Sequence, residues 1–131
     1  MSLNRLTLLV FAPLLILVGV LGFVIPPEQS LTSGAAPYNI FHIFFGVVAL
    51  VILFTRNETG AACFNLGFGL LDLYQFVASY VHLFPEQLFR WTRIDDALHI
   101  AIGLILFLIG VYGIMTNRPV PVRYVDHLPL S

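Results

Sequence analysis

Four long apolar segments constrain the fold of this chain more than any other feature. They cover residues 3–25, 38–55, 60–84 and 96–115. Each has close to, or more than, the roughly 20 apolar residues that a helix needs to cross a bilayer. Because lipid offers the backbone no hydrogen bonds, segments of this kind span it only as α-helices. The sequence therefore predicts an all-α fold, with a transmembrane domain of four helices over residues 1–118 and a polar C-terminal tail over residues 119–131.

The composition agrees with a lipid surrounding. Hydrophobic residues make up 59% of the 131 residues and charged residues only 10%, whereas a soluble domain carries roughly 25% charged residues. The net charge of −1 provides no basic face for nucleic acid, which we exclude as an expected partner. The expected partners are the lipid bilayer and either other membrane-protein subunits or further copies of this chain.

The positions of the arginines predict an orientation. Positively charged residues near the ends of membrane spans favour the cytoplasmic side. One end of the predicted bundle carries Arg5, Arg56, Arg118 and Arg123, and the other carries Arg90 and Arg93. This difference predicts that both termini are cytoplasmic, in a bacterial inner membrane or a thylakoid-type membrane.

The two halves of the chain carry the same signals in the same order. A Pro-Glu-Gln tripeptide follows the first and third segments, at Pro27 and Pro85. The second and fourth segments then open with related motifs, Asn39-x-x-His42-x-x-x-Gly46 and Asp96-x-x-His99-x-x-x-Gly103. We interpret the halves as two tandem helical hairpins that form a parallel internal repeat.

With these motifs, and with Leu21-Gly22-Phe23 and Pro26 closing the first segment, the chain resembles the small bacterial membrane proteins grouped as domain of unknown function 4383. The resemblance covers residues 4–115. It implies a four-helix membrane fold and no assigned activity, so it brings no catalytic residue to this sequence. Asp72 departs from the family, whose third span tends to be apolar.

Three histidines fall at one level of the predicted bundle. His42 and His99 lie about one turn inside the second and fourth segments, and His82 lies near the same end of the third. Imidazole is the commonest metal ligand, so all three are candidate ligands of a metal ion. Alternatively, His42 and His99 could hold the metal of a haem or a chlorophyll from facing helices, with Gly46 and Gly103 leaving room for a flat macrocycle.

Two polar residues are candidate supports for these histidines. Asn39 and Asp96 each lie three residues before a histidine, where they could hold its second ring nitrogen. In the structural alternative, Asn39, Asp95 and Asp96 cap the helix starts, and the histidines bridge neighbouring helices. The sequence leaves the structural, cofactor and metal interpretations open.

The third segment carries a polar stripe. Asn65, Asp72 and Ser79 recur every seven residues, with Gln75 beside them. A charged carboxylate near the middle of a bilayer costs about 2.5–3.5 kcal/mol on insertion scales. Asp72 is therefore either functional or protonated and hydrogen-bonded between helices, and its expected partners are Gln75 and a tyrosine such as Tyr74 or Tyr112.

Three functions are compatible with these features. Sparse polar content and short loops favour a non-catalytic accessory or assembly subunit that packs against a larger respiratory or photosynthetic complex. The alternative is a membrane carrier that binds a haem, chlorophyll, quinone, lipid or metal ion through its histidines. An enzyme or transporter that uses Asp72 is less favoured, because no second acid–base group clusters with it in the sequence.

Overall fold

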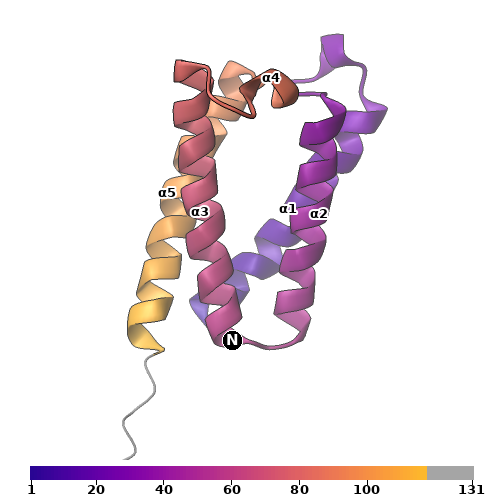
Figure 1. Cartoon of the computed structure of the whole chain (residues 1–131). Helices are drawn as coiled ribbons and strands as arrows, with labels where there is room; N and C mark the ends of the chain where they lie inside the picture. Colours follow the sequence, from indigo (N-terminus) through magenta and orange to yellow (C-terminus); the bar gives the residue numbers. More distant parts are fainter. Residues whose placement is uncertain (118–131) are drawn as a thin grey trace, which may run out of the picture.

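The computed structural model describes residues 1–117, which form a bundle of helices (Figure 1). Its four long helices are α1 (Leu3–Val24), α2 (Ala36–Phe54), α3 (Glu58–Val81) and α5 (Arg93–Thr116). A short 3-10 turn, η1 (Pro27–Gln29), and a short helix, α4 (Glu86–Phe89), lie in the connections. No strand occurs within these residues, and all four long helices are long and apolar enough to cross a membrane. The all-α prediction is confirmed, whereas the predicted tail over residues 119–131 lies outside the described residues.

The helix starts follow local capping chemistry. Ser2 and Asn57 accept hydrogen bonds from backbone N–H groups in the first turns of α1 and α3. Thr92 and Asp95 form a reciprocal capping box, so α5 begins at Arg93 rather than at residue 96 as the apolar pattern suggested. Polar residues at a helix start thus extend a helix beyond its apolar part.

The long helices associate as two closely packed pairs, α1 with α2 and α3 with α5. Glycine makes the close approach possible within each pair. A Cβ atom on Gly46 of α2 would lie 3.0 Å from the carbonyl oxygen of Ala12 in α1. A Cβ atom on Gly110 of α5 would lie 2.3 Å from the backbone nitrogen of Leu66 in α3, so only glycine fits there.

Aromatic rings connect α2 to α3, beside a depression of about 240 Å³ that Phe45 and Phe64 help to line. Phe68 of α3 lies with its ring centroid 5.4 Å from that of Phe45 and 6.1 Å from that of Phe41, both on α2. Phe64 stacks on Phe68 at 5.4 Å within α3. These rings join the two helix pairs along this side.

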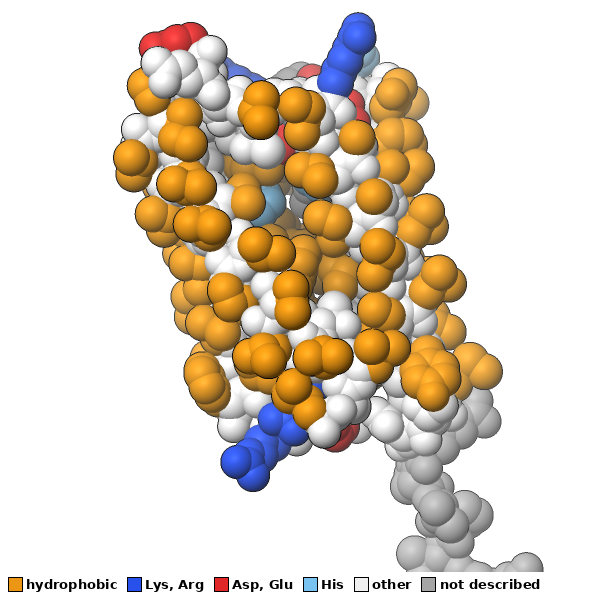
Figure 2. Space-filling view, turned by 180° about the vertical axis from the view of Figure 1, so that it is seen from behind, with side chains coloured by type: hydrophobic (Ala, Val, Ile, Leu, Met, Phe, Trp, Pro, Cys, Tyr) orange, Lys and Arg blue, Asp and Glu red, His pale blue; other side chains and the backbone are white. Residues whose placement is uncertain are grey.

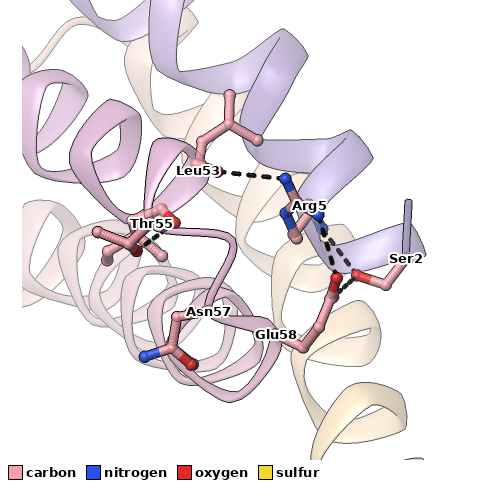
Figure 3. A network of polar contacts seen from close by, with 8 residues as sticks. Ser2, Arg5, Leu53, Thr55, Asn57 and Glu58 are labelled. Carbon is pink, nitrogen blue, oxygen red and sulfur yellow. Dashed lines mark hydrogen bonds and ion pairs between the residues drawn. The ribbon is translucent and has the colours of Figure 1, made fainter.

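A polar cluster joins the pairs at the end of the bundle where the chain starts (Figure 3). The Arg5 guanidinium contacts Glu58 of α3 at 3.3 Å and donates to the carbonyl oxygen of Leu53, near the end of α2, at 3.3 Å. The Ser2 hydroxyl also donates to Glu58. Next to this cluster, Asn65 of α3 donates to the side-chain oxygen of Asn4 at 2.9 Å, so α1 is held against α3 here.

The outer surface of the bundle differs from that of a soluble protein. Leucine, isoleucine, valine and phenylalanine cover the outer faces of the four long helices, and charged side chains gather at the two ends (Figure 2). The interior combines an apolar core, which includes Leu8, Ala12, Phe68 and Leu106, with buried polar side chains, namely Asn4, Ser33, Asn39, His42, Asn65, Asp72, Gln75, Asp95 and His99. An apolar outer surface, with polar side chains kept inside, is expected of helices that face lipid.

Candidate functional site

A cavity of about 210 Å³ lies between α1 and α5, near the end of the bundle that carries α4. Apolar side chains of these two helices form its mouth, among them Leu14 and Leu98, which also reach the outer surface. Figure 2 shows a hollow on this face, with a histidine side chain visible inside it. The polar part of the wall consists of Thr32, Tyr38, His42, Asp72 and His99. The structure therefore brings His42, His99 and Asp72 to one space, whereas the sequence analysis treated the histidines and the aspartate as separate features.

His42 projects from α2 with one ring nitrogen already engaged. Its Nδ1 lies 2.8 Å from the backbone carbonyl oxygen of Tyr38, one turn earlier, and its ring packs on the Tyr38 ring with centroids 4.1 Å apart. A carbonyl oxygen only accepts, so Nδ1 carries the proton and Nε2 of the neutral ring is an acceptor. His42 thus offers the cavity an acceptor nitrogen.

His99 enters the same cavity from α5. Its ring makes an edge contact with Trp91, with centroids 5.8 Å apart. Its buried Nδ1 has no hydrogen-bond partner among the described residues. Buried polar atoms are nearly always satisfied in folded proteins, so an unpartnered nitrogen beside a cavity requires an explanation.

Asp72 lies in α3 and forms the third polar element of the cavity wall, where it is buried. The expected partners are wrong. Tyr74 donates its hydroxyl to the carbonyl oxygen of Phe84 at 2.6 Å, and Tyr112 is exposed on the outer surface. Gln75 is buried, but its Oε1 has no partner within the described chain. Asp72 therefore faces the cavity rather than a side chain of a neighbouring helix.

A second polar centre, which the sequence analysis did not single out, lies around the buried Asp95 carboxylate and includes Tyr38 of the cavity wall. The Asp95 carboxylate accepts hydrogen bonds from the Tyr38 hydroxyl at 2.7 Å and from the backbone N–H groups of Ser33 and Thr92, both at 2.8 Å. The Ser33 hydroxyl donates to the carbonyl oxygen of Phe89, and that of Thr92 donates to the carbonyl oxygen of Leu31 at 2.9 Å. These bonds tie the connection before α2 to the start of α5.

Two local signals in the sequence indicate parts of this centre. Thr92 and Asp95 are spaced as a capping box, and Tyr38 lies four residues before His42, on the same helix face. The hydrogen bond between Tyr38 and Asp95 joins residues far apart in the chain, and no local pattern contains that information.

The predicted supports of the histidines do not touch them. Asn39 donates to the carbonyl oxygen of Gly34 at 3.3 Å, and the backbone of Tyr38 holds His42 instead. Asp96 lines a separate surface depression, and its buried Oδ1 has no partner in the described part of the chain. The expected capping roles are also wrong for both, because Ala35 and Thr92 are the N-caps of α2 and α5. Only Asp95 takes part in a cap, as the third residue of the capping box.

The two motif glycines serve helix packing. Gly46 faces Ile16 and Ala12 of α1, and a Cβ atom on Gly103 would lie 3.0 Å from the Cβ atom of Asp72 and 3.1 Å from the carbonyl oxygen of Gly69 in α3. Neighbouring helices thus occupy the space that a flat macrocycle would need beside these glycines.

His82 is not part of the cavity. It terminates α3 in a left-handed conformation, and its side chain is 78% exposed, with Nδ1 3.8 Å from Glu86. Within residues 1–117, no three His, Cys, Asp or Glu side chains are grouped as a metal ion would require. The structure therefore does not bring the three predicted metal ligands, His42, His82 and His99, together.

No family model, curated protein or solved structure matches this chain. The resemblance to domain of unknown function 4383 therefore stays a prediction.

The chemistry of the cavity follows from the residues that form its wall. His42 provides an acceptor nitrogen, His99 an unpartnered imidazole nitrogen and Asp72 a carboxyl group, and most of the remaining wall is apolar.

Proposed function

We propose that the chain is an integral membrane protein that binds a small, neutral, lipid-soluble ligand in the cavity between α1 and α5. The observation that carries this proposal is the convergence of His42, His99 and Asp72, from three different helices, on one mostly apolar cavity. Apolar pockets with a few converging polar groups are typical of small-molecule sites.

Location in a membrane is supported by the arrangement of side chains. Four helices are long and apolar enough to span a bilayer, and their outer faces are apolar while polar residues are inside. The mouth of the cavity is on an apolar face, so a ligand would enter from the lipid rather than from water. We retain a bacterial inner or thylakoid-type membrane with cytoplasmic termini as the proposed location. Arg118 and Arg123, on which that orientation depends, lie outside the described residues.

Equivalent positions of the two proposed hairpins make equivalent contacts, which supports an internal repeat. Gly46 approaches the carbonyl oxygen of Ala12 in the first pair, and Gly103 approaches that of Gly69 in the second. Residues 46 and 103 are as far apart along the chain as residues 12 and 69. The N-caps of α2 and α5, Ala35 and Thr92, have the same separation.

The accessory-subunit function expected from the sequence is the competing interpretation. Lipid alone would cover the apolar outer faces, so these faces do not distinguish the two functions. The cavity does, because packing against a larger complex gives no reason for His42, His99 and Asp72 to converge on one internal space. A ligand-binding function accounts for this convergence and for the unpartnered Nδ1 of His99.

The test is purification in mild detergent, after a carbonate wash of the membranes, followed by native mass spectrometry and an absorption spectrum. We expect about one lipid-soluble molecule per chain. Leu98→Trp should fill the cavity mouth and remove this molecule. Leu108→Trp, on the same helix but outside the cavity and 63% exposed, should retain it.

Three outcomes would contradict the proposal. A ligand-free chain that arrives with larger membrane subunits would support the accessory function instead. Equal retention of the molecule by Leu98→Trp would place the ligand outside the cavity. A Soret or chlorin band that both variants retain would likewise indicate a macrocycle bound elsewhere.

A further inference from the structure

The cavity adjoins an apolar groove on the same side of the bundle. The groove has a volume of about 320 Å³ and runs between α1 and α5 toward the Arg5 end. Phe11 and Ile102 line both spaces, so the groove continues from the cavity. Its remaining walls are almost wholly apolar, with Leu6, Val10, Ile105 and Ile109 among them. The two spaces together suit a molecule with a compact polar head and an apolar tail.

The cavity wall selects against a charged phospholipid head. None of the residues that line it is an arginine, and the chain contains no lysine. A phosphate is expected to need a cationic partner when it is removed from water, and an ionised Asp72 would repel it. The wall therefore excludes an anionic head group, and an uncharged head fits it. A cavity of about 150 Å³ in another protein holds benzene, so a space of about 210 Å³ accommodates a substituted ring.

The polar atoms of the wall match a head that both accepts and donates hydrogen bonds. Nε2 of His42 is an acceptor, because Nδ1 donates to Tyr38. Nδ1 of His99 has no protein partner within residues 1–117, and the ring donates from whichever nitrogen carries its proton. Asp72 accepts when ionised and donates when protonated. Carbonyl oxygens require donors and ring hydroxyl groups require acceptors, and this wall supplies both kinds.

We infer that the ligand is an isoprenoid quinone, with its ring in the cavity among His42, His99 and Asp72 and its tail in the groove between α1 and α5. This inference rests on the ligand-binding function proposed above. In the oxidised form, the two oxygens of the quinone accept hydrogen bonds from His99 or from protonated Asp72. In the reduced form, a hydroxyl group of the quinol donates to Nε2 of His42. Benzoquinones and naphthoquinones share this chemistry, and the titrations below separate them by ring size.

Trp91 provides a built-in probe. It is the only tryptophan in the sequence, and its ring is 5.8 Å from that of His99. Quinones quench indole fluorescence at short range. The full chain in detergent is titrated with a decyl benzoquinone, a short-chain isoprenoid naphthoquinone and a tail-less benzoquinone, with quenching of Trp91 as the readout.

We expect saturable quenching by at least one of the tailed quinones, at about one molecule per chain. The tail-less quinone should bind at least about tenfold more weakly, because each buried CH₂ of the tail contributes to affinity. The ring preference, benzoquinone or naphthoquinone, identifies the ring that fits. Decylbenzene, which has the same tail and no oxygens, should displace a bound quinone poorly.

Variants of the histidines test the polar contacts. His99→Phe should weaken quinone binding by about tenfold or more, because a buried carbonyl oxygen of the ligand loses its donor. His42→Phe should weaken binding of the reduced quinol by a similar factor, measured by competition with the quinone, because a quinol hydroxyl loses its acceptor. His99→Gln, which keeps a donor, should recover part of the affinity. His82→Phe is the matched control, since His82 is exposed and outside the cavity, and it should bind as the unmodified chain does. Circular dichroism checks that each variant is folded.

Two results would overturn the quinone assignment while leaving the ligand-binding function intact. One is displacement of the quinone by decylbenzene as readily as by another quinone. The other is a co-purifying cavity ligand, removed by Leu98→Trp, that is not a quinone. Non-saturable quenching that is the same in all histidine variants would show only partition of the quinone into the micelle, and would also overturn the assignment.

Discussion

Where α2 meets α3, phenylalanine rings connect the helix pairs beside an apolar depression, whereas the space between α1 and α5 forms a cavity with polar groups in its wall and a groove. Both sides are apolar, so hydrophobicity alone does not distinguish them. The difference is in the size of the side chains and in the presence of polar groups, because His42, His99 and Asp72 converge only on the open side. One side joins the pairs, and the other is available to a ligand.

Polar contacts join the two helix pairs at both ends of the bundle. Asn4 and Asn65 connect α1 to α3 at one end, and Asp95 connects the start of α5 to Ser33 and Tyr38 at the other. Contacts of this kind hold helices at a set distance without filling the space between them. The comparison therefore predicts that loss of packing on the closed side and loss of polar contacts around the open side have different consequences.

The largest expected effect is on the closed side. Phe68→Ala removes a buried ring that contacts Phe11, Phe41, Phe45 and Phe64, and should lower the free energy of unfolding by about 3–5 kcal/mol. Titration with SDS in mixed micelles, followed by circular dichroism, measures this change. Phe54→Ala is the control, because that side chain is 77% exposed and should cost far less. Equal losses in the two variants would show that the aromatic contacts do not join the pairs.

The second largest effect on stability is expected at Asp95, at the start of α5. Asp95→Ala leaves the N–H groups of Ser33 and Thr92 and the Tyr38 hydroxyl without their acceptor. Unsatisfied buried donors cost about 1–3 kcal/mol each, so we expect a loss of about 3 kcal/mol, measured by the same unfolding titration. Asp96→Ala removes the neighbouring carboxylate, whose buried oxygen has no partner among the described residues, and should change stability by less than about 0.5 kcal/mol. A loss of stability in Asp96→Ala as large as that in Asp95→Ala would contradict the role of Asp95.

The helices were predictable from the sequence because length and apolarity determine them locally. The capping box of Thr92 and Asp95 is equally local, and it explains why α5 begins earlier than its apolar part. The location of His42 and His99 near one end of the bundle also followed from their distance to the helix starts. The sequence did not predict the cavity that joins them into one site, because the cavity depends on the distance between α1 and α5.

The errors have a common physical cause. Partners for His42, His99 and Asp72 were sought three residues away on the same helix or among nearby tyrosines, since helical spacing is all that a sequence displays. In the folded chain, His42 is held by a backbone carbonyl, and Asp72 faces a space formed by other helices. Asp95 was noticed only as a capping residue, because its main partners, Tyr38 and Ser33, come from the other half of the chain.

The smallest expected effect sharpens the comparison by testing the contacts within a pair. Gly110→Ala places a Cβ atom against the backbone of Leu66, which cannot rotate away, so α5 must move from α3. Overpacking of this kind costs about 1–3 kcal/mol. Gly67→Ala is matched to it, since a Cβ atom there meets nothing within 4 Å, and a helical alanine should stabilise the chain by about 0.5–1 kcal/mol relative to glycine. Opposite signs in the unfolding titration would confirm that close packing is needed within the pairs, and equal signs would contradict it. Because α5 also forms one wall of the cavity, Gly110→Ala should weaken ligand binding as well, whereas Gly67→Ala should leave it unchanged.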